Sequence, residues 1–350
     1  MKKLIAIFFN LIVGVVLASA IGGGGWAAVG IGAGLSVVRT GATGLTMAIQ
    51  KEIWENDIVE ALWANNQFLQ YAFNADQYVL AGKVVHIPQA GTSVSVSTNR
   101  SSLPATVTTR TDTEINYSLD ELTTDPVRIP NADTVELSYD KRNSVLSDTK
   151  MSIAEAAALN LLFKWNPTPA GNIIRTTGSA VAAHTDSATG NRKAFSVADV
   201  KAAQKQFNKW NIPTNDRYML IDADMYDQLT ADLTATQYRD FSAALDVSNG
   251  VVGKLYSFNI MMRSTVARYT NATTPVPVLW SASGDAAHNA AALCWHKNSV
   301  ERALGMVNFF EDLGNPAYYG DIYSALVRVG GRIRRNDAKG VLAIVQAATT

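Results

Sequence analysis

Residues 196–222 read SVADVKAAQKQFNKWNIPTNDRYMLID, and this stretch decides the fold class. Ser196 and Asp199 have the spacing of a capping box, in which each side chain accepts a hydrogen bond from the other residue's backbone amide, so a helix begins here. Apolar residues recur on one face of that helix until Pro213 ends it. The run 217–222 is typical of a buried strand, and a short helix follows it. A helix, a strand and a second helix predict an α/β layer with one covered sheet.

Upstream of this layer the spacing predicts a longer helix over about 136–165. Its apolar residues recur at intervals of seven and then four, and they are Tyr139, Leu146, Ile153, Ala157, Leu161 and Trp165. Pro167 and Pro169 end it. Apolar residues spaced by three and four over 50–73 predict one amphipathic helix or two short ones.

A polar segment lies between these two helical regions. Residues 91–113 hold twelve serines and threonines among 23 residues, with valines in an alternating pattern. Such residues favour strands but offer no hydrophobic face for a core. A long hairpin that turns near 99–102 cannot stabilise itself in water, so we expect it to lie on another subunit.

Downstream of residue 222 the chain alternates strands and turns. The predicted strands are 259–263, 276–280, 291–295, 306–310, 323–329 and 341–345, interrupted by a helix at about 299–304. The α/β layer is thus followed by a remainder rich in strands. A single cysteine, Cys294, leaves no second thiol for an intrachain disulfide and reads as a small core side chain.

The first 46 residues have a composition of their own. Residues 1–20 follow the pattern of a secretory signal, with two lysines, an apolar run and the small residues Ala18-Ser19-Ala20. The run 4–21 is also barely long enough to span a bilayer. Three possibilities stay open. Residues 1–21 could direct export or membrane association, the leader could stay intact and pack against protein, or the protein could begin at Met47.

Charge is balanced overall but unevenly placed. The chain has 30 bases and 30 acids, yet residues 47–324 hold 22 bases and 29 acids, a net charge of −7. A body of that sign repels phosphate, which argues against a dedicated nucleic-acid reader. The segment 325–350 has five bases and one acid, so its positive charge needs a partner.

Motifs for catalysis, nucleotide binding and paired-cysteine metal sites are absent from the sequence. Asp222 and Asp224 follow a predicted strand and could hold a divalent metal, but a helix cap is favoured because a helix begins there. Four histidines lie on four different elements, His86, His184, His288 and His296. Metal ligation by them would need long-range convergence that no motif signals, and His86 reads as part of a polar strand face. We therefore predict no catalytic, cofactor or metal site.

The bases of 325–350 have two readings. They could bind phosphate, or they could pair with acids of neighbouring subunits, and the acidic body favours the second. The candidate assembly contacts are Arg100, Arg110, Arg332, Arg334, Arg335, Glu311, Asp312 and Asp321.

The order of elements from about 47 to 346 resembles the major capsid proteins of tailed bacteriophages, whose fold encapsulins share. The resemblance rests on five stretches: Met47-Ala-Ile-Gln-Lys-Glu-Ile-Trp, Gly82-Lys-Val-Val-His-Ile-Pro88, the helix ending at Trp165, Trp210-Asn-Ile-Pro with Asp216–Asp222, and a closing pattern from Phe309 to Val341. None is catalytic, so the resemblance is one of architecture.

The resemblance implies an α+β fold with an N-terminal arm, an extended β-hairpin loop, a long spine helix, and peripheral and axial domains. The implied limits are a leader over 1–46, the arm over 47–83, the loop and flanking strands over 84–130, the spine helix and a peripheral α/β domain over 131–222, a mainly axial domain over 223–305, and closing strands over 306–350.

The function that the resemblance implies is structural, without an enzyme activity or a cofactor. Copies of the chain would form pentamers and hexamers of an icosahedral shell around double-stranded DNA, bound without sequence recognition. Portal, scaffold or decoration proteins would be partners, and the virion would assemble in the host cytoplasm. The alternatives are an encapsulin-type compartment and a secreted or envelope-anchored β-rich binding protein, for which the leader argues.

Overall fold

The computed structural model describes residues 54–62, 66–80, 84–89, 96, 98–100, 107, 109, 113–130 and 141–349. Contacts divide the chain into two compact units, 1–57 and 58–350, and almost all described residues belong to the second. The leader, residues 1–46, lies outside the described residues. None of the described helices combines the length and hydrophobicity that crossing a bilayer requires.

In the described ranges the largest sheet has seven strands of mixed direction. Across the sheet they run β11 (Val251–Leu255), β12 (Phe258–Arg263), β10 (Arg217–Asp222), β14 (Asn289–His296), β17 (Val341–Val345) and β7 (Ile173–Arg175), with β13 (Ala267–Tyr269) beside β14. Strand β10 lies parallel to β12 and antiparallel to β14. Every residue of β10, β14 and β17 is buried, as the continuous apolar runs predict.

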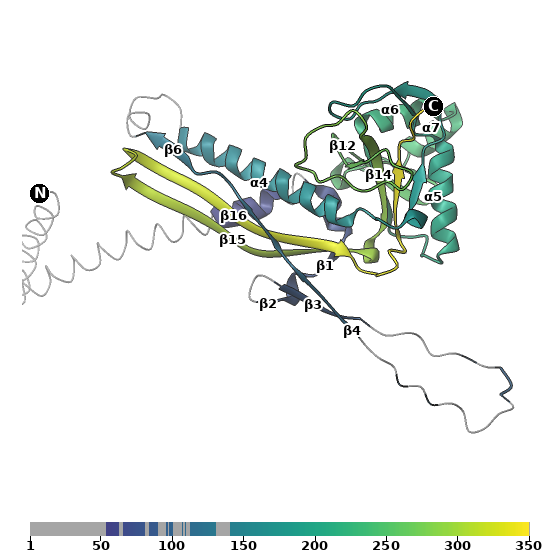
Figure 1. The fold of residues 1–350 in the computed structure, drawn as a ribbon, viewed down its shortest axis with the longest axis horizontal. Helices are drawn as coiled ribbons and strands as arrows, with labels where there is room; N and C mark the ends of the chain where they lie inside the picture. Colours follow the sequence, from purple (N-terminus) through teal and green to yellow (C-terminus); the bar gives the residue numbers. More distant parts are fainter. Residues whose placement is uncertain are drawn as a thin grey trace, which may run out of the picture. The chain divides into compact units, whose positions relative to one another are not determined.

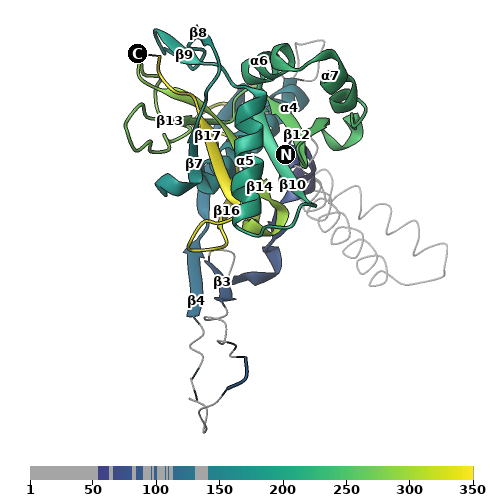
Figure 2. The same cartoon turned by 90° about the vertical axis from the view of Figure 1, so that its right-hand side faces the viewer.

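Three helices accompany this sheet: α5 (Val197–Lys209), α6 (Ala223–Asp232) and α7 (Ala235–Ser242). Figure 2 shows α5 in front of β10, β14 and β17. Its Val200 and Phe207 pack in the main core with Met219 of β10. The predicted capping box is present, since the amide of Ser196 donates to Asp199 Oδ2 over 2.9 Å.

A second sheet is built on a long hairpin of β15 (Val300–Asn315) and β16 (Gly320–Ile333), beside which the spine helix α4 (Lys141–Trp165) runs (Figure 1). Strand β1 (Phe73–Asn74) pairs with β15, while β5 (Asp120–Thr123) and β6 (Val127–Pro130) pair with β16. The smaller sheets are β2 (Val79–Leu80), β3 (Val84–Gln89) with β4 (Thr113–Ser118), and β8 (Ala180–Ala182) with β9 (Asn191–Lys193). Short 3-10 turns span Gln67–Tyr71, Asp76–Tyr78, Ala170–Asn172, Val247–Asn249 and Lys297–Ser299.

Aromatic side chains join the spine helix to the seven-stranded sheet. Trp165, the last residue of α4, lies with its ring centroid 5.8 Å from that of Trp295 in β14. Its indole Nε1 donates to the Glu301 carbonyl over 2.9 Å, which ties the helix end to β15 as well. The end of the spine helix is therefore a junction between both sheets.

Two predicted elements are wrong. Residues 299–304 are not a helix, because β15 begins at Val300 and pairs with β16, and this tertiary pairing overrides the helix propensity of the segment. Residues 276–280 form no strand beyond one isolated bridge between Tyr269 and Pro277. Proline has no amide hydrogen to donate to a ladder.

The other predicted elements that lie in the described residues agree in type, with differences in extent. The segment 50–73 divides into a helix over 54–62 and a 3-10 turn at Gln67–Tyr71, and the chain is already in β1 at Phe73. The spine helix is described from Lys141, and the predicted start at 136 lies outside the described residues. The limits of peripheral and axial domains stay a prediction. Strands on both sides of residue 222 share the seven-stranded sheet.

Candidate assembly surfaces

One face of the β15–β16 hairpin is fixed to the rest of the subunit. Side chains alternate between the two faces of a strand, and Tyr323, Ala325, Val327 and Val329 are at most 2% exposed. At Gly331 an added Cβ would lie 2.7 Å from Leu161 Cδ2 and 2.8 Å from the Glu301 carbonyl oxygen, so only glycine allows this close approach of β16 to α4. One face of the hairpin thus packs closely against the spine helix.

The outer half of the same hairpin exposes large apolar side chains. Tyr319 is 76% exposed, and Phe310, Leu313 and Tyr318 are between 39% and 55% exposed. Such residues gathered at one end of an element mark an interaction surface in a soluble protein. We call residues 310–322 the hairpin tip.

The predicted acidic contacts also lie at the hairpin tip. Asp312 accepts a hydrogen bond from Asn315 Nδ2 over 2.6 Å, and Asp321 Oδ1 accepts one from the Gly314 amide over 2.8 Å. Both acids therefore help to shape the turn. Glu311 stands opposite Tyr323 in the β15–β16 register.

The predicted basic contacts lie at the opposite end of the hairpin, which we call the hairpin root. Arg334 Nε is 3.5 Å and Arg332 Nε is 4.0 Å from the carboxylate oxygens of Glu301. Arg335 donates two hydrogen bonds of 2.9 Å to Asp337. These hydrogen bonds are the main cause of the low pKa of Asp337, which is about 2. The cluster thus has acidic partners within its own chain.

The distance along the hairpin decides which charges can meet. Asp321 and Arg332 both lie on β16, eleven residues apart, which is about 36 Å at ~3.3 Å per residue. The acids at the tip of one subunit therefore cannot reach the bases at its own root. The predicted pairing between them requires a second subunit and stays a prediction.

Glu301 is the residue that sequence reasoning missed. It is 1% exposed, and burial raises its pKa to about 7, against the opposing effect of Arg332 and Arg334. Tyr117 of β4 also contributes to the environment of this carboxyl. The only sequence signal was an acid two residues before the buried Ala303 in a strand pattern, which the predicted helix at 299–304 concealed.

The extended loop has its base on β3 and β4. There His86 Nδ1 lies 2.6 Å from Glu114 Oε1, so the prediction of a satisfied polar strand face is confirmed. Most of the predicted hairpin, with Arg110, lies outside the described residues, and Arg100 is described and exposed. Val96 and Val107 are 95% and 94% exposed. These valines have almost no contact with their own subunit.

The comparisons with known proteins decide the family. A family model described as phage capsid protein matches residues 79–308. The chain belongs to this phage capsid protein family. The capsid of Ralstonia phage GP4 is similar with a TM-score of 0.59 and 12% identity, over 80% of this chain and 88% of that one. The search of curated proteins found no match.

Two cyanophage capsids are similar to this capsid protein as well. That of P-SCSP1u has a TM-score of 0.55 at 19% identity, covering 80% of this chain and 87% of that one. That of Pam1 has a TM-score of 0.55 at 12% identity, covering 81% and 92%. At these identities the similarity shows the fold, so the α+β capsid architecture predicted from the sequence is confirmed.

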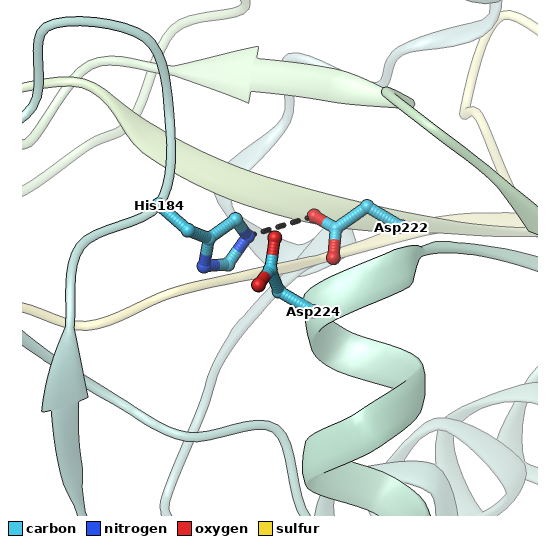
Figure 3. Close-up of side chains that lie close together, drawn as sticks. All are labelled: His184, Asp222 and Asp224. Atoms are coloured by element: carbon cyan, nitrogen blue, oxygen red, sulfur yellow. Dashed lines mark hydrogen bonds and ion pairs between the residues drawn. The ribbon is translucent and has the colours of Figure 1, made fainter.

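The capsid protein also brings together residues that the sequence kept apart. Asp222 caps α6, as predicted, by accepting from the Met225 amide over 2.7 Å. Long-range convergence, which no motif in the sequence signals, places His184 Nε2 2.9 Å from Asp222 Oδ2. Asp224 completes the group, shown in Figure 3. Cys294 is fully buried, as predicted, and burial raises the pKa of its thiol.

Proposed function

We propose that this capsid protein assembles with itself into pentamers and hexamers, and that these build an icosahedral shell around double-stranded DNA. The observation that carries the proposal is the polarity of the β15–β16 hairpin. Exposed apolar and acidic residues lie at its tip, and bases lie at its root, about 36 Å away along β16. These two surfaces complement each other and cannot meet within one chain.

Tip-to-root contacts have a consequence for symmetry. They join different surfaces of two copies, so they are heterologous, and heterologous contacts close into rings when the rotation between copies allows it. At the root, Arg332, Arg334, Arg335 and Lys339 face only Glu301 and Asp337 as nearby acids among the described residues. Positive charge is left over there to attract the acidic tip of a neighbour.

The extended loop supports the same proposal from a different surface. Its two described valines, Val96 and Val107, are almost completely exposed, and a polar hairpin of this length is marginal on its own in water. A neighbouring subunit that covers the loop would bury both valines. The loop and the N-terminal arm would then overlap neighbours and lock the rings together.

The charge of the body supports a wall around DNA that does not adhere to it. Residues 47–324 have a net charge of −7, which opposes tight binding of phosphate. Portal, scaffold or decoration proteins and assembly in the host cytoplasm belong to the same proposal. The protein acts in it by forming contacts, without catalysis.

The experiment compares assembly of the full-length protein with that of two tyrosine variants. Wild-type protein should form closed particles by light scattering and negative-stain microscopy. Tyr319→Ser removes the most exposed aromatic of the hairpin tip and should lower particle yield. Tyr238→Ser, an equally conservative loss of an exposed tyrosine on α7, is the matched control and should keep it.

Two results would contradict the proposal. If wild-type protein remains as single chains under all salt conditions, the protein does not assemble with itself and the proposal is wrong. If Tyr319→Ser gives a normal particle yield, the hairpin tip is not the contact surface.

A further inference from the structure

A second group of polar residues has no part in the assembly surfaces. His184 lies in the loop between β8 and β9, Asp222 is the last residue of β10, and Asp224 is in the first turn of α6. All three line a cavity of about 340 Å³. The chain thus brings a histidine and two carboxylates from separate segments to one place (Figure 3).

Asp222 is held in position by two contacts. Its Oδ1 accepts from the Met225 amide over 2.7 Å, and its Oδ2 lies 2.9 Å from His184 Nε2. The side chains of Asp222 and His184 are only 7% and 15% exposed. A carboxylate that caps a helix with one oxygen still has the other oxygen available as a ligand.

The spacing of the donor atoms suits one bound ion. One atom from each of the three residues lies within 4.8 Å of the other two. Ligands about 2.0–2.2 Å from a tetrahedral metal are about 3.3–3.6 Å apart, so the exposed Asp224 side chain has to turn toward the other two residues to complete the set. Figure 3 shows both carboxylates on the Nε2 side of the imidazole ring.

An independent observation concerns the other ring nitrogen. His184 Nδ1 is buried and has no hydrogen-bond partner among the described residues. Buried polar atoms in proteins are almost always satisfied, and an exception is commonly explained by a water or an ion. Hydrogen bonds in the described part of the chain therefore hold this ring only through Nε2 and Asp222 Oδ2, and a metal ligand of this kind would donate its Nδ1 hydrogen to a water.

We propose that His184, Asp222 and Asp224 bind one divalent transition-metal ion of the Zn²⁺ type. An imidazole nitrogen with two carboxylates is a donor set that Zn²⁺ accepts, whereas Ca²⁺ takes six to eight oxygen ligands and Mg²⁺ retains several waters. Binding requires the Nε2 lone pair, so any proton on Nε2 is released to solvent and Nδ1 carries the ring hydrogen.

The other charged groups at the cavity do not oppose this assignment. Arg268 lines it, but its guanidinium donates to the backbone carbonyls of Leu279, Trp280 and Ala282. Asp186 adds a further carboxylate to the lining. A bound ion would brace the β8–β9 loop against the end of β10, independently of shell assembly.

The test is calorimetric titration of ZnCl₂ into chelator-treated full-length protein. Wild-type protein should bind one Zn²⁺ per chain, and Asp224→Asn should weaken the affinity at least about tenfold. Asp227→Asn removes another exposed carboxylate of α6 outside the cluster and is the matched control, with affinity expected within about twofold of wild type. Circular dichroism of each variant verifies that it is folded.

A second measurement identifies the ligands without relying on stability. Co²⁺ bound in place of Zn²⁺ should give a visible absorption spectrum that His184→Gln alters or removes. The proposal is overturned if wild-type protein shows no saturable Zn²⁺ binding, if Asp224→Asn binds Zn²⁺ as wild type does, if His184→Gln leaves the Co²⁺ spectrum unchanged, or if Mg²⁺ or Ca²⁺ binds more tightly than Zn²⁺.

Discussion

Replacement of Glu301 by glutamine should remove a pH dependence from the stability of the subunit. Glu301 is buried at the hairpin root beside Arg332 and Arg334, and its pKa in the folded chain is about 7. In the unfolded chain the ordinary glutamate value of 4.5 applies. The folded state therefore binds the proton more tightly. The stabilisation of the folded state by the protonated Glu301 carboxyl is complete below pH 4.5 and is lost as pH rises to about 7.

The size of the effect follows from those two values. One pH unit between folded and unfolded pKa corresponds to about 1.4 kcal/mol. Wild-type protein should thus lose about 3 kcal/mol of unfolding free energy through Glu301 between pH 4.5 and pH 8. Glutamine has a similar shape and does not ionise, so Glu301→Gln should lack this loss whatever its stability at pH 4.5.

The assay is urea unfolding of wild type and Glu301→Gln over this pH range, with light scattering to confirm one assembly state in all samples. The control, Glu121→Gln, also removes a carboxylate that faces an arginine on β16, but the Glu121 side chain is 47% exposed. An exposed pair contributes at most about 1 kcal/mol. Parallel pH curves for wild type and Glu301→Gln would refute the reasoning.

Three further predictions concern the loop, the hairpin root and the packing on the spine helix. Deletion of residues 94–108 should leave a folded subunit by circular dichroism that no longer forms particles; particles of normal size would show that the loop is not a contact. Replacement of Arg332, Arg334 and Arg335 by glutamine should weaken assembly most at low salt, because the remaining carboxylates then repel unscreened; an unchanged yield of empty particles at low salt contradicts root-to-tip pairing. Gly331→Ala should destabilise the subunit by about 1–3 kcal/mol in urea unfolding, since its Cβ would overlap α4, and an unchanged midpoint would exclude that contact.

Local signals in the sequence predicted the elements that are fixed by local physics. The capping box at Ser196, the proline stop after Trp165 and the apolar run 218–221 each predict their element directly. Of the two elements that were wrong, 276–280 contains Pro277, which cannot donate to a ladder, whereas 299–304 depends on a tertiary partner. Residues 299–304 become a strand only because β16 lies beside them.

The candidate site divides in the same way. The sequence offered the bases at the hairpin root and the acids at its tip as candidate contacts, since both are visible as charges that flank the predicted strands 306–310 and 323–329. It could not identify Glu301 as the acid beside Arg332 and Arg334, because that contact depends on the β15–β16 register. It also could not bring His184 to Asp222, which is 38 residues away in the chain.

The most direct test of the central proposal is a cryo-electron microscopy reconstruction of particles formed by the purified full-length protein. The proposal predicts a closed shell with icosahedral symmetry, five copies around each vertex, rings of six between vertices, and the hairpin tip of one copy against the hairpin root of the next. Open sheets, isolated chains, or rings in which the tip and the root are both exposed to solvent would contradict it.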